Sequence, residues 1–114
     1  MQMMEYVKTI VDALEDKKAN DIKVIRISEI SSMADYLILA DGDNRNQIQA
    51  MSDNVEESMR KANMELKNRE GYANGGWILL DYYDIIVHIF SETERAFYDL
   101  DRIWSDGEYV YLGE

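Results

Sequence analysis

The spacing of apolar and polar residues along the chain predicts three helices. Between residues 3 and 18, apolar side chains recur at the spacing of one helix face: Val7, Ile10, Val11 and Leu14. The strongest helical pattern follows Asn44, with apolar residues every three or four positions: Ile48, Met51, Val55, Met59 and Ala62. Asn44 with Gln47 is typical of a capping box that fixes the start of this helix. Ser91 with Glu94 predicts the same start for a short helix through about Leu100.

Runs of β-branched and other apolar residues predict strands in both halves of the chain. In the first half they are DIKVIRI at residues 21–27 and DYLILAD at residues 35–41. The link between these two runs is too short for a crossover helix. In the second half, WILLDY at residues 77–82 and IIVHIF at residues 85–90 are about two residues apart, which favours a hairpin.

Two further segments give weaker signals. MELKNREG at residues 64–71 is a candidate strand, whereas the tail from residue 104 to 114 has aromatic and apolar residues without a regular period. The order of elements predicts an α/β fold with helices packed on a mixed sheet of four or five strands. No repeat, proline stretch or low-complexity linker divides the chain, so we expect residues 1–114 to form a single domain.

The charge of the chain narrows the class of partner. Twelve Lys and Arg against 23 Asp and Glu give a net charge of −11, which repels a phosphate backbone and predicts no direct nucleic-acid specificity. From Asp81 onward there are nine acids and only two arginines, so this third of the chain carries most of the excess charge. A basic partner is the electrostatic expectation, although acidity that serves solubility explains the same composition.

Composition also excludes several kinds of chemistry and compartment. The absence of cysteine removes disulfides and thiolate metal sites, and the single histidine, His88, removes a multi-histidine zinc site. No apolar run is long enough for a membrane span, and the N-terminal segment lacks the pattern of a secretory signal. We therefore expect a cytoplasmic protein that has no membrane partner.

Two candidate sites for chemistry each have a simpler explanation. Asp41 and Asp43 follow a predicted strand and precede a helix, where two carboxylates could hold Mg²⁺, but Asp-Gly-Asp is also typical of a turn. His88 is a candidate general base, or a residue of the less buried sheet face that hydrogen-bonds a neighbour. The glycines form neither a dinucleotide-binding fingerprint nor a P-loop.

The aromatic residues of the last third fit either a core or an interface. This holds for four of them: Trp77, Tyr82, Tyr98 and Trp104. Tryptophan and tyrosine are the side chains that most often anchor protein interfaces, and here they lie among acids. Glu94 is explained by the Ser91 capping box alone, and Arg95 by an ion pair with Asp99 one turn away.

Four runs together resemble one family over nearly the whole chain. They are ADYLILADGDNRNQIQA at 34–50, EG at 70–71, WILLDYYDIIVHIF at 77–90 and ERAFYDLDRIW at 94–104. In this order and spacing they are similar to the ribosomal silencing factor family, also called RsfS or Iojap. The loop departs from the family pattern, because Asp41 and Asn44 stand where the family has threonine and serine.

The resemblance implies both a fold and a function. The expected fold is nucleotidyltransferase-like but without catalytic activity or a cofactor. The expected function is binding to the large ribosomal subunit through the ribosomal protein L-fourteen. Such binding would block joining of the small subunit and repress translation when nutrients are scarce. The free protein would be a homodimer.

We expect the partner-binding surface to lie on the hairpin and the helix after it, where aromatic residues act as anchors and acids pair with a basic partner. The predicted contact residues are Trp77, Asp81, Tyr82, Asp84, His88, Glu94, Arg95 and Tyr98. Two alternatives remain at this point. One is an active Mg²⁺-dependent nucleotidyltransferase using Asp41 and Asp43, and the other is an acidic adaptor for a different basic protein.

Overall fold

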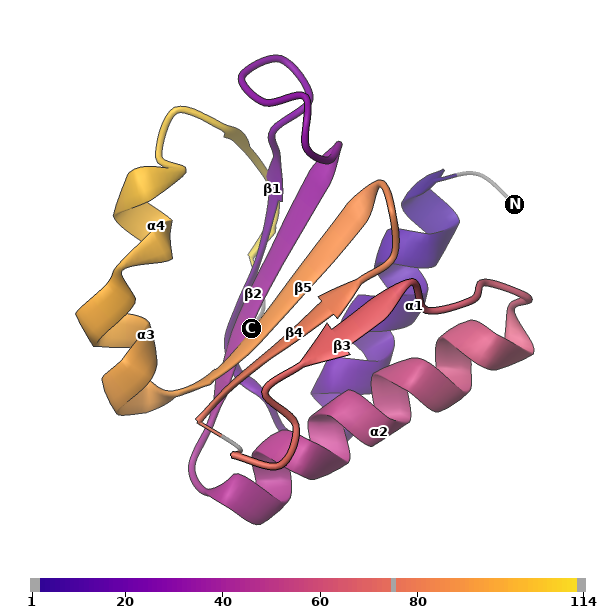
Figure 1. Ribbon diagram of the computed structural model, residues 1–114. Helices are drawn as coiled ribbons and strands as arrows, with labels where there is room; N and C mark the ends of the chain where they lie inside the picture. Colours follow the sequence, from indigo (N-terminus) through magenta and orange to yellow (C-terminus); the bar gives the residue numbers. More distant parts are fainter. Residues whose placement is uncertain (1–2, 75, 113–114) are drawn as a thin grey trace.

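The computed structural model describes residues 3–74 and 76–112, which form one mixed sheet with helices on both faces (Figure 1). The elements in chain order are α1 (Met3–Asp16), β1 (Asn20–Arg26), β2 (Tyr36–Gly42), α2 (Arg45–Lys61), β3 (Asn68–Glu70), β4 (Trp77–Asp81), β5 (Ile85–Ser91), α3 (Glu92–Tyr98), α4 (Leu100–Ile103) and β6 (Glu108–Leu112). The predicted α/β class is confirmed. Within the described ranges, every helix is too short or too polar to cross a membrane.

The sheet has six strands in the order β3-β4-β5-β2-β1-β6, where four or five strands were predicted. Only β2 and β5 are parallel among the paired strands described, and the other neighbours are antiparallel. The short link after β1 makes β1 and β2 antiparallel, as its length requires. Because β2 lies in the middle and is covered on both faces, six of its seven residues are buried.

The two faces of the sheet are covered by different helices. Helices α1 and α2 lie on one face, and α3 and α4 lie on the other (Figure 1). Side chains alternate between these faces along β4, so Ile78 and Leu80 join the core under α1 and α2. Trp77 and Leu79 pack instead against the smaller cluster on the α3–α4 face.

Both predicted helix starts are confirmed. The side chain of Asn44 accepts a hydrogen bond from the backbone N–H of Gln47, and Ser91 accepts one from the N–H of Glu94. At the start of α2, the second hydrogen bond of the capping box differs from the usual one. The side-chain Oε1 of Gln47 accepts from the backbone N–H of Asp43, one residue before the N-cap. Gln47 Nε2 also donates to the carbonyls of residues 17 and 18, which ties the start of α2 to the end of α1.

The C-terminal region differs from its prediction in two ways. The helix that begins after Ser91 is interrupted at Asp99, whose φ of 51° lies in the left-handed region, and this residue separates α3 from α4. The tail, for which no regular structure was predicted, contributes the edge strand β6 beside β1. Glu108, Tyr109 and Val110 of β6 are all exposed, so burial imposes no alternation of apolar and polar residues on these three positions.

Candidate interaction surface

Four rings form a cluster on the α3–α4 face of the sheet. The ring of Trp77 on β4 lies 4.4 Å from Tyr98 of α3, 5.0 Å from Phe90 and 5.7 Å from His88, measured between centroids. His88 and Phe90 alternate on β5 and so point to the same face as Trp77, which is opposite Phe90 in the register. Contacts at these distances fix the orientation of α3 against the hairpin.

His88 is a neutral hydrogen-bond acceptor in this cluster. Its Nδ1 accepts a hydrogen bond of 2.9 Å from the indole N–H of Trp77. The side chain is 8% exposed, and burial lowers the pKa of His88 to about 4, so the ring is uncharged at neutral pH. The sequence interpretation in which His88 hydrogen-bonds a neighbour is therefore confirmed, and the residue positions Trp77.

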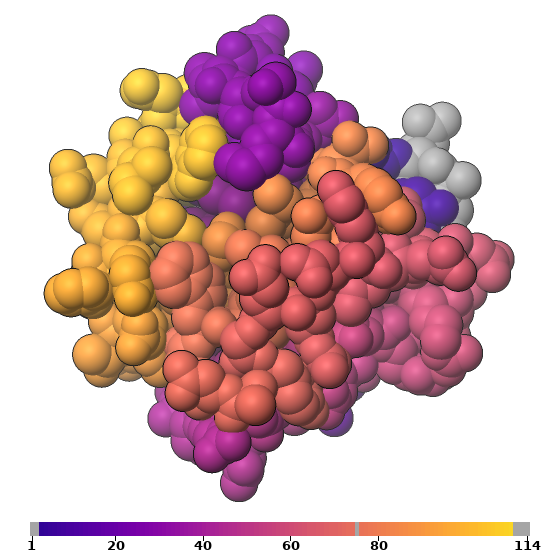
Figure 2. All heavy atoms as spheres, in the orientation of Figure 1, coloured from indigo at the N-terminus to yellow at the C-terminus, as the bar shows by residue number. Residues whose placement is uncertain are grey.

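An exposed apolar edge adjoins the ring cluster. Phe97 is 79% exposed and Tyr98 is 40% exposed, and their rings meet edge to face at 5.1 Å. Trp77, which contacts Tyr98, is half-buried, and so is Leu79 on the same face of β4. In Figure 2, the residues of α3 and α4 lie beside those of the β3–β4 region on one face of the molecule. We call Trp77, Leu79, Phe97 and Tyr98 the aromatic surface.

Acidic residues border the aromatic surface at the start of α3. Glu92 and Glu94 lie in the first turn of this helix. The Glu94 side chain lies beside Gly76, where a Cβ atom would be 3.7 Å from its Cγ, so the carboxylate is next to the start of β4. Among the described residues, neither Glu92 nor Glu94 has a side-chain ion pair that would neutralise it. The aromatic surface therefore has a negative rim, which suits a basic partner.

Arg95 does not belong to this surface, because it is 7% exposed and points into the protein. Its guanidinium lies 3.1 Å from Asp41 Oδ2 on β2 and 3.0 Å from Asp101 Oδ2 on α4. It also donates a hydrogen bond of 2.7 Å to the carbonyl of Asp21 on β1. The predicted pair with Asp99 is wrong, since Asp99 pairs with Arg102 instead. Arg95 thus links α3 and α4 to the centre of the sheet.

The carboxylates around Arg95 respond to burial in opposite ways. For Asp41, burial raises the pKa and outweighs the attraction of Arg95. For Asp101, burial also favours the neutral form, but hydrogen bonds from Arg95 and Lys23 dominate and lower the pKa to about 2. Lys23 Nζ is 2.9 Å from Asp101 Oδ2, so two cations share this carboxylate.

The two aspartates proposed as metal ligands are engaged elsewhere. Asp41 faces the guanidinium of Arg95, while the exposed Asp43 accepts a hydrogen bond of 2.8 Å from the side chain of Asn20. Within residues 3–74 and 76–112, no three acidic or histidine side chains are grouped so that they could hold a metal ion. The donor set that a Mg²⁺-dependent transferase needs is not assembled at this turn.

The structure divides the remaining predicted contact residues. Asp81 and Asp84 lie at the turn of the β4–β5 hairpin, where Asp81 is roughly 13 Å along the strand from Trp77 and Asp84 is further away. Asp81 Oδ1 accepts a hydrogen bond from the N–H of Tyr83, which stabilises the positive φ of that residue. Tyr82 is 1% exposed and belongs to the core under α1 and α2, on the other face of the sheet.

Three predicted contact residues therefore need correction. Tyr82, His88 and Arg95 are buried, so their side chains support the fold and are not on the surface. Trp77, Glu94 and Tyr98 come together, whereas Asp81 and Asp84 form a separate acidic end of the hairpin. Phe97 and Leu79 were not predicted. The period of two along β4 indicates Leu79, because it repeats two positions after Trp77.

Comparisons with known proteins cover nearly the whole chain. The family model described as "Ribosomal silencing factor during starvation" matches residues 1–113. A ribosomal silencing factor from Halalkalibacterium halodurans is 33% identical over 112 residues, which are 98% of this chain and 96% of that protein. The chloroplastic protein Iojap of Arabidopsis thaliana is 25% identical over 97% of this chain and 46% of its own length.

A solved structure has the same fold. The crystal structure of a protein from Chromobacterium violaceum superposes with a TM-score of 0.90 and is 31% identical. The match covers 92% of this chain and 88% of that one. The arrangement of strands and helices described above is therefore also found in an experimental structure.

Proposed function

Because the chain belongs to the ribosomal silencing factor family, we propose that it binds the large ribosomal subunit and prevents the small subunit from joining. The family match over residues 1–113 is the observation that carries this proposal. The contact on the large subunit is the ribosomal protein L-fourteen, and the outcome is repression of translation when nutrients are limiting. The site of action is the cytoplasm.

A steric block needs affinity and bulk but no catalysis, and the observed surface fits that requirement. The aromatic surface offers exposed rings held on a rigid sheet, and Phe97 and Tyr98 are the side chains suited to a desolvated contact. Glu92 and Glu94 supply the charge that attracts a basic protein and repels RNA. The engagement of Asp41 by Arg95 is a further reason to propose a non-enzymatic role without a cofactor.

We also propose that the free protein is a homodimer. An exposed apolar edge of this kind is unfavourable in water and is commonly covered in one assembly or another. Sedimentation velocity on the wild type and on Phe97→Ser tests whether the aromatic surface forms the dimer contact. A dimer that dissociates only in the variant would place Phe97 in the dimer contact, and a monomeric wild type would overturn the proposal of a homodimer.

The test of the function is co-sedimentation with isolated large and small subunits over a salt series, together with an assay of subunit joining. We expect selective, salt-sensitive binding to the large subunit and inhibition of joining. Tyr98→Ala should weaken this binding at least about tenfold, because a partly exposed ring at an interface acts as an anchor.

Three matched charge reversals locate the contact. Glu94→Lys changes a residue beside the aromatic surface, and Asp84→Lys changes one at the hairpin turn. Asp12→Lys changes a residue of α1, which covers the opposite face of the sheet. We expect Glu94→Lys to reduce binding and Asp12→Lys to leave it unchanged, while Asp84→Lys reports whether the contact extends along the hairpin. Equal effects of all three would indicate only attraction to net charge. Binding to a basic protein without preference for large subunits would favour the acidic adaptor.

A further inference from the structure

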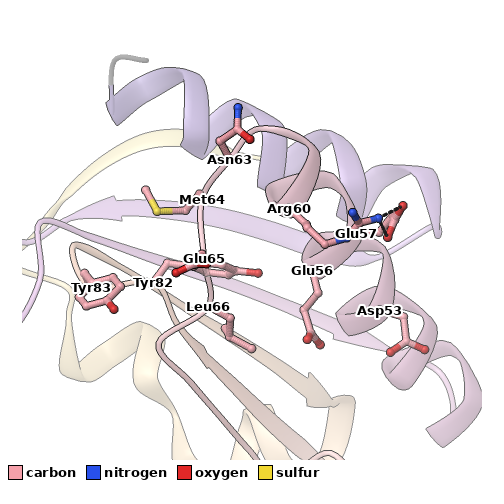
Figure 3. Close-up of a pocket in the computed structure, with 10 residues that line it drawn as sticks. All are labelled: Asp53, Glu56, Glu57, Arg60, Asn63, Met64, Glu65, Leu66, Tyr82 and Tyr83. Atoms are coloured by element: carbon pink, nitrogen blue, oxygen red, sulfur yellow. Dashed lines mark hydrogen bonds and ion pairs between the residues drawn. The ribbon is translucent and has the colours of Figure 1, made fainter.

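An acidic groove lies on the α2 side of the molecule, away from the aromatic surface. It has a volume of about 1140 Å³ and runs between α2, the segment after it and the β4–β5 hairpin (Figure 3). Four carboxylates, those of Asp53, Glu56, Glu57 and Glu65, line it together with the guanidinium of Arg60. Arg60 and Lys61 pair with Glu57, and Arg69 pairs with Glu56, so the uncompensated negative charge of the lining comes mainly from Asp53 and Glu65.

A buried hydroxyl without a partner lies at the floor of this groove. Tyr82 extends from the hairpin toward α2 beneath the segment of residues 64–66 (Figure 3), and the residue is 1% exposed. No described residue forms a hydrogen bond with its Oη. Burial raises the pKa of Tyr82, and the negative charge of Glu56 adds to this, so the phenol stays protonated and neutral. An unsatisfied buried hydroxyl is costly, so a hydrogen-bonding group that reaches this position would be stabilised there.

The carboxylates are arranged for a long cation and not for a compact ion. Asp53 precedes Glu56 by three positions, which places their Cβ atoms about 5–6 Å apart along one face of α2. Asp53 accepts a hydrogen bond from the hydroxyl of Tyr72 through Oδ2 only, whereas Glu57 is held by Arg60. As noted for Asp41, the described residues hold no acidic cluster suited to a metal ion, and this groove is no exception. Met64 and Leu66 provide apolar wall between the charges, which suits alkyl segments between cationic groups.

We propose that this groove binds a linear polyamine, with one ammonium donating a hydrogen bond to Tyr82 Oη and the others pairing with the carboxylates of the rim. Glu56 makes its contacts with Ser52 and Arg69 through Oε2, so Oε1 faces no described donor. Glu65 is exposed and makes no hydrogen bond or ion pair with a described residue, so its carboxylate is free to turn toward an ammonium. The ligand is thus a flexible alkyl chain with several ammonium groups.

Calorimetric titration of the full chain with spermidine, supported by amide chemical shifts, tests the proposal. We expect one site, with shifts concentrated on the residues that line the groove. Tyr82→Phe removes only Oη and should weaken binding about tenfold, because a hydrogen bond to a charged group is lost. Glu65→Gln, an exposed position with no role in the fold, should weaken it about two- to fivefold.

Two matched controls keep these effects specific. Tyr36→Phe removes a hydroxyl outside the groove, and Glu92→Gln removes an exposed charge on α3; neither should change spermidine binding. Equal affinity in all variants, or the same shifts from Mg²⁺ at equal ionic strength, would overturn the proposal in favour of diffuse attraction to an acidic chain. Equal binding of Nα-acetyl-lysine amide would also overturn it, since the site would then recognise a single lysine head.

Discussion

Removing the guanidinium of Arg95 should be among the most destabilising single changes in this protein. Arg95→Met keeps an unbranched side chain but leaves the carboxylate of Asp41, which is 5% exposed, without its cation. Breaking a buried ion pair in this way costs about 3–5 kcal/mol. That is a large part of the roughly 5–15 kcal/mol by which a domain of this size is stable. Asp101 is less affected, because Lys23 still contacts it.

Urea unfolding followed by tryptophan fluorescence measures this loss. With a denaturant slope of about 2 kcal/mol/M, a cost of 4 kcal/mol lowers the midpoint by roughly 2 M. Trp77 and Trp104 both pack on the α3–α4 face, so their emission reports detachment of these helices as well as global unfolding. An amide-exchange experiment distinguishes the two, since detachment alone would leave α1 and α2 protected.

A double-mutant cycle supplies the control. Asp41→Ala in the Arg95→Met background removes the uncompensated charge, so the double variant should be more stable than the sum of the two single losses implies. The loss of unfolding free energy caused by Arg95→Met should also become smaller as the pH falls toward 4. The reason is that the pKa of Asp41, already raised by burial, rises further without Arg95, and a protonated carboxyl needs no cation. A loss below about 1 kcal/mol, or strict additivity, would refute this account of the network.

Three further predictions use other parts of the structure. The pKa of His88 is lowered from 6.5 to about 4, so stability should fall by about 3 kcal/mol as the pH drops through this window. His88→Gln should flatten that slope in urea titrations, and an unchanged slope would contradict it. Gly71 has a φ of +81°, and an added Cβ would lie 2.1 Å from the carbonyl oxygen of Trp77. Gly71→Ala should therefore lower thermal stability by more than about 2 kcal/mol in melts followed by circular dichroism, and an unchanged melt would contradict this. Phe97→Ser should change stability by no more than about 0.5 kcal/mol, yet weaken large-subunit co-sedimentation; unweakened binding would remove Phe97 from the proposed contact.

The elements that sequence reasoning predicted well are those whose signals are local. The start of α2 depends on Asn44 and Gln47, three positions apart, and the hairpin depends on two apolar runs separated by a turn. The antiparallel pairing of β1 with β2 follows from the length of their link. In each of these cases a few neighbouring residues determine the geometry.

The elements that were missed depend on contacts between distant parts of the chain. Strand β6 is stabilised by backbone pairing with β1, which no periodicity in the tail can reveal. Arg95 contacts Asp41, Asp101 and the carbonyl of Asp21 and makes no ion pair with the nearby Asp99. These three oxygen groups come together only in the folded protein, so sequence spacing does not indicate them. Helix propensity alone also gives no indication that Asp99 adopts a left-handed conformation.

The candidate contact surface stays a prediction, and the structure shows which of its residues are neighbours. The rings of Trp77 and Tyr98 are in contact, and Glu94 lies beside Gly76, next to Trp77. Strand alternation separates Trp77 from Tyr82, because residues an odd number apart on a regular strand face opposite sides. Applied strictly, this rule would have assigned Tyr82 to the core. It would not have indicated whether the Tyr82 hydroxyl has a hydrogen-bond partner.

The pairing of β6 with β1 has a consequence for the order of events during synthesis of the chain. Strand β6 begins about 80 residues after β1 ends. At ordinary rates of protein synthesis, roughly 4–16 s therefore pass between the synthesis of β1 and that of its partner strand. Asp41 emerges long before Arg95 and stays hydrated until α3 arrives. Phe97 and Tyr98 are also on α3, so the aromatic surface cannot assemble before this helix has been synthesised. The buried ion pair and the aromatic surface therefore both depend on the docking of the same helix, α3.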